Sequence, residues 1–67
     1  MSVARVTEIT ASSTESFDAA MKEGVERAAR TLQNITGAWI QEQKVMIADG
    51  EISEYRVNMK ISFVLND

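Results

Sequence analysis

The sequence predicts a small α+β domain with the element order β-α-β-β. Three observations lead to this order: a β-branched segment near the N-terminus, a central stretch with helical periodicity, and a long alternating segment that follows an Asp-Gly turn signal. The chain has 67 residues, which suffices for one domain and is too few for two. We therefore expect residues 1–67 to form a single domain.

The first strand is expected over residues Val3–Thr10, because this segment is rich in β-branched side chains. A polar cluster follows it. Within that cluster, Ser12 and Glu15 have the spacing of a capping box, in which the serine hydroxyl accepts a backbone amide and the glutamate reaches back to the cap amide. This motif predicts that a helix begins near Ser13.

The next segment has the periodicity of a helix with one buried stripe. Apolar or small residues recur at spacings of three and four, namely Phe17, Ala20, Met21, Gly24, Val25, Ala28 and Leu32. Gly24 has two interpretations: a close approach by the sheet or by a neighbouring subunit, or a tolerated glycine. Gly37 can take the left-handed conformation that ends a helix, so we expect the helix to stop there or one or two residues earlier.

The last thirty residues are interpreted as a hairpin. Asp49 and Gly50 form the dipeptide that a type I′ turn favours. After the turn, apolar residues alternate strictly with polar ones, which predicts a strand with one buried and one solvated face. This strand is about 14 residues long, well above the usual length. In so small a domain, a strand of this length must either project beyond the rest of the chain or wrap around it. Either arrangement leaves strand edges exposed unless another copy of the chain covers them.

The composition restricts the chemistry. The chain contains no Cys and no His, so disulfides, a zinc clamp and the usual nucleophile and imidazole mechanisms are excluded. We therefore expect no enzymatic activity, no catalytic residues, and stabilisation by self-association. A net charge of −3 argues against a nucleic-acid partner. The absence of a long apolar run or a signal-peptide pattern favours a soluble, cytoplasmic protein without a membrane partner.

Two features of the predicted hairpin could bind a ligand. Trp39, the single tryptophan, could stack on a flat ring such as a flavin or a nucleobase, or it could fill a core or an interface. Arg56, Asn58 and Lys60 form a polar ladder on the last strand, which suits phosphate, carboxylate or amide recognition. The same ladder could instead be a solvated face.

The acidic residues do not identify a metal site. The alternating acids of an EF-hand loop are absent. Glu42 and Glu54 lie on facing strands of the predicted hairpin, where they could approach each other or pair with Lys44 and Arg56. The sequence pattern therefore assigns no residue as a metal ligand, and the metal-binding residues stay unknown.

The whole chain resembles the dodecin family. The residues that carry the resemblance are Val3–Val6, Ser16–Ala20, Glu26–Ala28, Glu54–Val57 and Ile61–Phe63. The resemblance implies a three-stranded antiparallel sheet wrapped around one helix and a hollow homododecamer. It also implies binding and storage of a small ligand where subunits meet, without catalysis, the family default being a flavin such as FMN or riboflavin.

The candidate cofactor-binding residues depart from the family pattern. Flavin-binding dodecins carry a stacking Trp where this chain has Gly37, and a Gln where it has Arg56, so the chain is more similar to a branch that lacks both. Trp39 lies two residues after Gly37, on the same side of a strand and about 7 Å further along. Arginine offers only hydrogen-bond donors. The alternative is a dodecin-like shell that has lost flavin binding and binds calcium or another cation, or serves as a scaffold.

Overall fold

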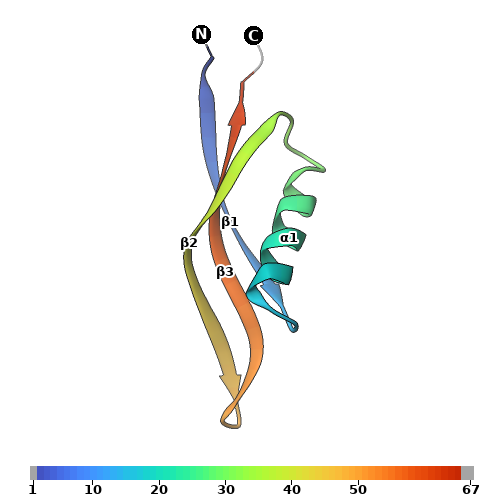
Figure 1. The fold of residues 1–67 in the computed structure, drawn as a ribbon, viewed down its shortest axis with the longest axis vertical. Coiled ribbons are helices and arrows are strands. Elements are labelled where there is room, and N and C mark those ends of the chain that lie inside the picture. Colours follow the sequence, from blue (N-terminus) through green and yellow to red (C-terminus); the bar gives the residue numbers. More distant parts are fainter. Residues whose placement is uncertain (1, 66–67) are drawn as a thin grey trace.

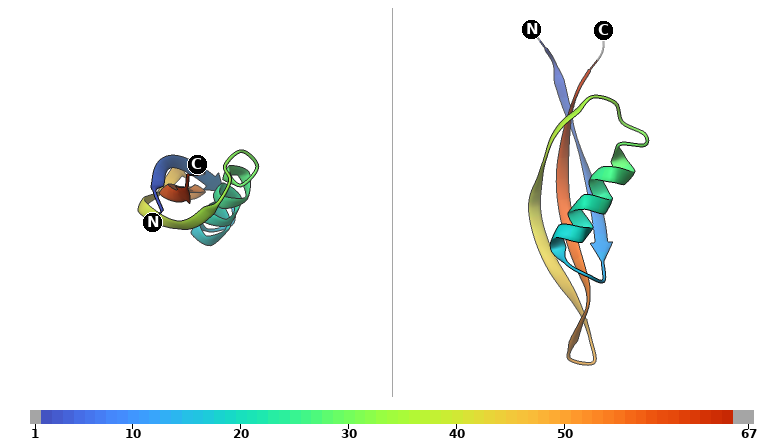
Figure 2. Two further views of the ribbon diagram at one scale, coloured as in Figure 1. Left: turned by 90° about the horizontal axis from the view of Figure 1, so that it is seen from above. Right: turned by 45° about the vertical axis from the view of Figure 1, so that its right-hand side comes forward.

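The computed structural model describes residues 2–65 and confirms the order β-α-β-β. The elements are β1 (Ala4–Ser13), α1 (Phe17–Ala28), β2 (Ile35–Ala48) and β3 (Glu51–Val64). The three strands form one antiparallel sheet with β3 in the middle, in the order β1-β3-β2. Helix α1 covers one face of this sheet and leaves the other open (Figures 1 and 2).

The helix begins later than the capping box predicted. Ser16 is the N-cap, and its hydroxyl accepts the amide of Ala19 at 3.0 Å. Ser12 and Ser13 belong to β1 instead, because they continue its pairing with β3. The predicted cap at Ser12 is therefore wrong, since strand pairing supplies more backbone hydrogen bonds than one helical turn would.

The helix also ends earlier than predicted, at Ala28. The amide of Leu32 donates to the carbonyl of Ala28 at 2.8 Å, and Asn34 then takes the left-handed conformation with φ 62°. The carbonyl of Asn34 accepts the amide of Val64 at 3.0 Å, which leads the chain into β2. Gly37 lies inside β2, so its predicted role as helix terminator is wrong. Asparagine tolerates the left-handed region and makes a glycine unnecessary.

The core lies between α1 and the middle strand. Val57, Met59 and Ile61 of β3 are completely buried, as their alternation predicted, and Val57 and Met59 form a cluster with Ala20 of the helix stripe. A Cβ added at Gly24 would lie 2.9 Å from Met59 Sδ and 3.1 Å from Ala11 Cβ. The structure thus confirms a close approach of the sheet to Gly24.

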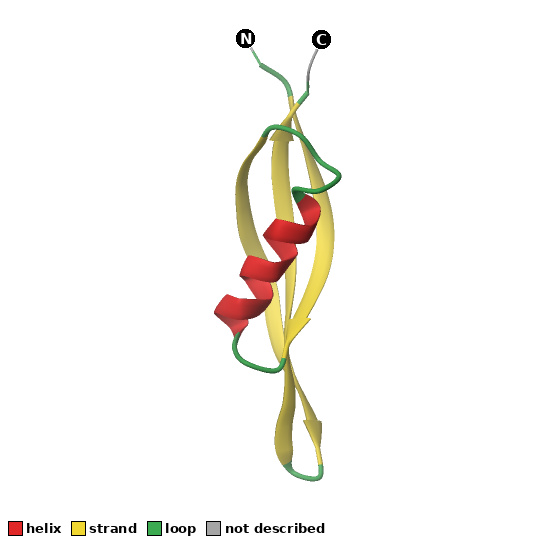
Figure 3. Cartoon of the chain, turned by 90° about the vertical axis from the view of Figure 1, so that its right-hand side faces the viewer, coloured by secondary structure: helices red, strands yellow, loops and turns green. Residues whose placement is uncertain are grey.

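The hairpin confirms the turn prediction and extends past the helix. Asp49 and Gly50 both have positive φ, 53° and 78°, as a type I′ turn requires. The described residues span 51 × 19 × 13 Å, and the turn lies at one end of the long axis, beyond α1 (Figures 1 and 3). No helix within residues 2–65 is long and apolar enough to cross a membrane.

The contact at Gly24 predicts that Gly24→Ala destabilises the fold, although alanine favours a helix. Alanine gains up to about 1 kcal/mol of helix propensity, whereas overpacking typically costs about 1–3 kcal/mol. We expect a net loss of about 1 kcal/mol, measured by chemical unfolding at one fixed protein concentration. Glu26→Ala on the exposed side of α1 is the control and should change stability by less than about 0.5 kcal/mol. A gain in stability for Gly24→Ala would contradict this packing.

Candidate functional site

The face of the sheet that points away from α1 gathers the residues predicted to bind a ligand. The buried residues of β3 point toward α1, so the residues between them point away from it. We call this side the outer face. Residues paired across antiparallel strands point to the same side. The rows of the outer face across β1, β3 and β2 are Ser12, Arg56 and Lys44; Thr10, Asn58 and Glu42; and Glu8, Lys60 and Trp39.

Arg56 is held in place at one end of the outer face. Its Nη2 lies 2.7 Å from Glu54 Oε1 in an ion pair, and its Nε is 3.3 Å from Ser12 Oγ. About one third of each charged side chain stays exposed, so Arg56 keeps donors available for a ligand. Of the alternatives for Glu42 and Glu54, the pairing of Glu54 with Arg56 is confirmed. Glu42 is paired in register with Asn58 and Glu54 with Met46, so the two acids are not cross-strand neighbours.

The ion pair changes the acidity of Glu54. The hydrogen bond from Arg56, followed by the hydrogen bond with Ser12, holds the pKa of Glu54 below its ordinary value. A carboxyl whose pKa is lower in the folded state stabilises the fold above its unfolded-state pKa. This contribution is lost as the pH falls through the lowered folded-state pKa. The ion pair between Glu54 and Arg56 is therefore present at neutral pH and is lost when acid protonates Glu54.

A small polar cavity lies beside Arg56. Asn58 lines this cavity and donates from Nδ2 to Glu8 Oε2 at 3.0 Å and to Thr10 Oγ1 at 3.3 Å. The cavity has a volume of about 200 Å³ and is lined by Thr10, Glu42, Gln43, Lys44, Arg56 and Asn58. This volume is below the range of about 300–1,000 Å³ for small-molecule pockets. In one subunit, it suits only part of a ligand.

Gly37 and Trp39 lie together at the other end of the outer face. Gly37 is paired with Ser62 and Trp39 with Lys60, which confirms that both point to the same side. The indole of Trp39 is nearly half exposed, at 46%. A Cβ added at Gly37 would meet only the Ser62 hydroxyl, at 3.3 Å. The strand around Trp39 is therefore open to a flat ligand.

One subunit does not bring Trp39 and Arg56 into contact. Lys60 and Arg56 are four residues apart on β3, which corresponds to about 13 Å at about 3.3 Å per residue. Lys60 is the direct neighbour of Trp39, and sequence reasoning placed it only in the general polar ladder. Strand alternation gives its side of the sheet, but its pairing with Trp39 depends on register shifts in β2, between Ile40 and Glu42 and between Met46 and Ile47.

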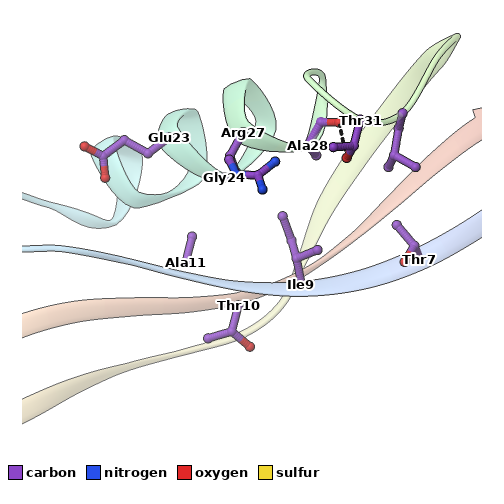
Figure 4. Close-up of a pocket in the computed structure, with 10 residues that line it drawn as sticks. Thr7, Ile9, Thr10, Ala11, Glu23, Gly24, Arg27, Ala28 and Thr31 are labelled. Carbon is purple, nitrogen blue, oxygen red and sulfur yellow. Dashed lines mark hydrogen bonds between the residues drawn. The ribbon is translucent and has the colours of Figure 1, made fainter.

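A larger cavity lies on the other side of the sheet, between β1 and α1 (Figure 4). Its volume is about 480 Å³. The lining residues are Thr7, Ile9, Thr10, Ala11, Glu23, Gly24, Arg27, Ala28, Thr31 and Leu32. The sequence did not predict this cavity. Among residues 2–65, no group of three or more acidic side chains gathers in a way that could hold a metal ion.

Comparisons with known proteins point to one family. The dodecin family model matches residues 3–66. Dodecin from Streptomyces davaonensis is 35% identical with a TM-score of 0.93, and the match covers 98% of this chain and 97% of that one. Dodecin from Streptomyces coelicolor is 29% identical with a TM-score of 0.94, covering 98% and 94%. No curated protein matches the sequence.

A further solved structure is similar at a lower TM-score. It is the calcium dodecin from Mycobacterium tuberculosis, described as having a novel calcium-binding site. It is 28% identical to this chain with a TM-score of 0.84, and the match covers 96% of this chain and 91% of that one.

The hydrogen bonds of Arg56 predict that Arg56→Gln raises the pKa of Glu54 toward its ordinary value. The neutral amide removes the charged donor that stabilises the carboxylate. Carboxyl chemical shifts followed by NMR against pH measure the change. Lys60→Gln is the control, because Lys60 makes no ion pair with Glu54 among the described residues. An unchanged Glu54 pKa in Arg56→Gln would contradict this assignment.

Proposed function

The chain belongs to the dodecin family, and from this premise we propose that it is an oligomeric protein that binds and stores a small ligand where subunits meet. The observation that carries this proposal is the half-exposed indole of Trp39 beside Lys60 on the open face of the sheet. A large aromatic side chain exposed next to a cation is a typical binding surface for a flat anionic ligand. The proposed role is binding, without catalysis.

Self-association supports the proposal physically. A single subunit exposes many large apolar side chains: Val3, Val6, Trp39, Ile40, Met46, Ile47, Ile52 and Leu65. Surfaces of this kind mark contacts with other protein chains. We propose the closed homododecamer of the family as the assembled state, in which outer faces of several copies converge and turn open surfaces into lined sites.

FMN or riboflavin is the ligand we propose first. The isoalloxazine ring would stack on the exposed Trp39, next to Gly37, which carries no side chain on the same face. The phosphate of FMN would accept hydrogen bonds from Lys60. Arg56 is about 13 Å away along β3, so it would contact the ring edge or phosphate of a ligand held mainly by a second copy.

A cation-binding or purely structural shell is the alternative. Glu8 and Glu42 also lie on the outer face. Glu42 is paired in register with Asn58, and Glu8 accepts a hydrogen bond from the Asn58 side chain. Calcium takes about 6–8 oxygen ligands, and one subunit gathers no such group among residues 2–65. A calcium site would therefore need acidic side chains from more than one copy. The similar calcium dodecin from Mycobacterium tuberculosis makes this alternative specific.

The proposed site predicts different losses of flavin affinity when Trp39 and Lys60 are replaced. Trp39→Ala should weaken both FMN and riboflavin about tenfold, because a stacked aromatic pair contributes up to about 1.5 kcal/mol beyond its buried area. Lys60→Gln should weaken FMN and leave riboflavin nearly unchanged, because only FMN carries the phosphate. Quenching of flavin fluorescence in titrations measures both affinities, after light scattering has sized each assembly.

Two controls decide between flavin binding and the alternative. The double variant Gly37→Trp and Arg56→Gln restores the residues of the flavin-binding pattern, and only the Ser62 hydroxyl lies close to the new Cβ at position 37. Flavin affinity confined to this double variant would contradict native flavin binding and favour the alternative. Calorimetry with calcium then tests whether the native assembly binds the cation or only forms a shell.

A further inference from the structure

The hairpin tip, residues 46–52, is an apolar surface that its own subunit leaves uncovered. Ile47 and Ile52 are paired in register, and they are 66% and 52% exposed. Met46 beside them is also exposed. Asp49 and Glu51 give the turn two negative charges. The hairpin tip is thus an apolar pair next to an acidic turn, at the end of a projecting arm (Figure 3).

The cavity between β1 and α1, which we call the helix cleft, is the complementary surface. Its volume of about 480 Å³ is ample for two branched aliphatic side chains. Half of its lining residues are apolar or glycine, among them Ile9, Ala11 and Leu32, and the rest are three threonines and the oppositely charged Glu23 and Arg27. Arg27 extends from α1 toward β1 at this opening (Figure 4). Its side chain makes no ion pair or hydrogen bond to the residues between 2 and 65.

The hairpin tip cannot reach the helix cleft of its own subunit. The turn lies at one end of the 51 Å axis, beyond α1, and β2 and β3 lead from it into the sheet (Figure 1). The cleft lies away from the turn, between α1 and β1. The apolar residues of the tip and of the cleft, and the acidic turn and Arg27, can therefore meet only between two copies.

We propose that the hairpin tip of one copy occupies the helix cleft of a second copy. Ile47 and Ile52 lie against the apolar lining, and the acidic turn pairs with Arg27. This inference rests on the self-association in the proposed function and specifies one of its contacts. The contact is heterologous, because each copy offers one tip and one cleft. Repetition of such a contact about a rotation axis closes a ring with no tip or cleft left uncovered.

Cross-linking tests the contact cleanly, because the chain has no cysteine of its own. We expect the double variant Ile47→Cys and Thr31→Cys, treated with a short bis-maleimide, to shift from the monomer band to a ladder of dimers, trimers and larger species on denaturing gels. The matched control Ile47→Cys and Lys22→Cys should give no ladder, because Lys22 is exposed on α1 and does not line the cleft.

A charge exchange provides an independent measurement. Arg27→Glu should lower the assembled mass in light scattering, and adding Glu51→Lys should restore it, because the exchange recreates the opposite charges. An intact assembly with no ladder and no response to Arg27→Glu overturns the inference while leaving self-association and ligand binding standing. Monomers in every native preparation would overturn it together with the proposed assembly.

Discussion

The fold depends on one contact, in which the small residues of α1 lie directly against the middle strand β3. The sulfur of Met59 lies 2.9 Å from the position that a Cβ of Gly24 would take. Within residues 2–65, only Val57, Met59 and Ile61 among the large side chains are fully buried. Helix α1 has 12 residues, whereas β2 and β3 have 14 each. The helix therefore cannot cover the sheet, and the hairpin tip and the outer face remain open.

The same strand that forms the core also positions the candidate site. Because side chains alternate along a strand, the burial of Val57 and Met59 fixes Asn58 on the opposite face, and Arg56 and Lys60 follow the same alternation. These polar side chains stand on the strand that also supplies the fully buried Val57, Met59 and Ile61. A site built on a packed strand is more rigid than one on a loop. This arrangement suits binding and storage.

The features that the sequence predicted best are those with a single local cause. The alternation of β3 and the turn at Asp49 each follow from one backbone requirement, whereas Gly24 left two interpretations open until the packing of Met59 against it decided between them. The helix ends were missed because contacts outside the helix decide both. Pairing with β3 keeps Ser12 in β1 and leaves Ser16 as the N-cap. At the other end, Asn34 takes the left-handed conformation before the chain reaches Gly37. The pairing of Trp39 with Lys60 and the helix cleft depend on tertiary structure, which no local pattern records.

One subunit leaves many large apolar side chains exposed, and we infer that it folds and assembles in one coupled step. The most direct test is the midpoint of denaturant unfolding, followed by circular dichroism over a wide range of protein concentrations, with light scattering on the same samples. We expect the unfolding midpoint to rise with protein concentration, and the loss of secondary structure to coincide with the loss of assembled mass. A folded monomer whose midpoint does not depend on concentration would contradict it.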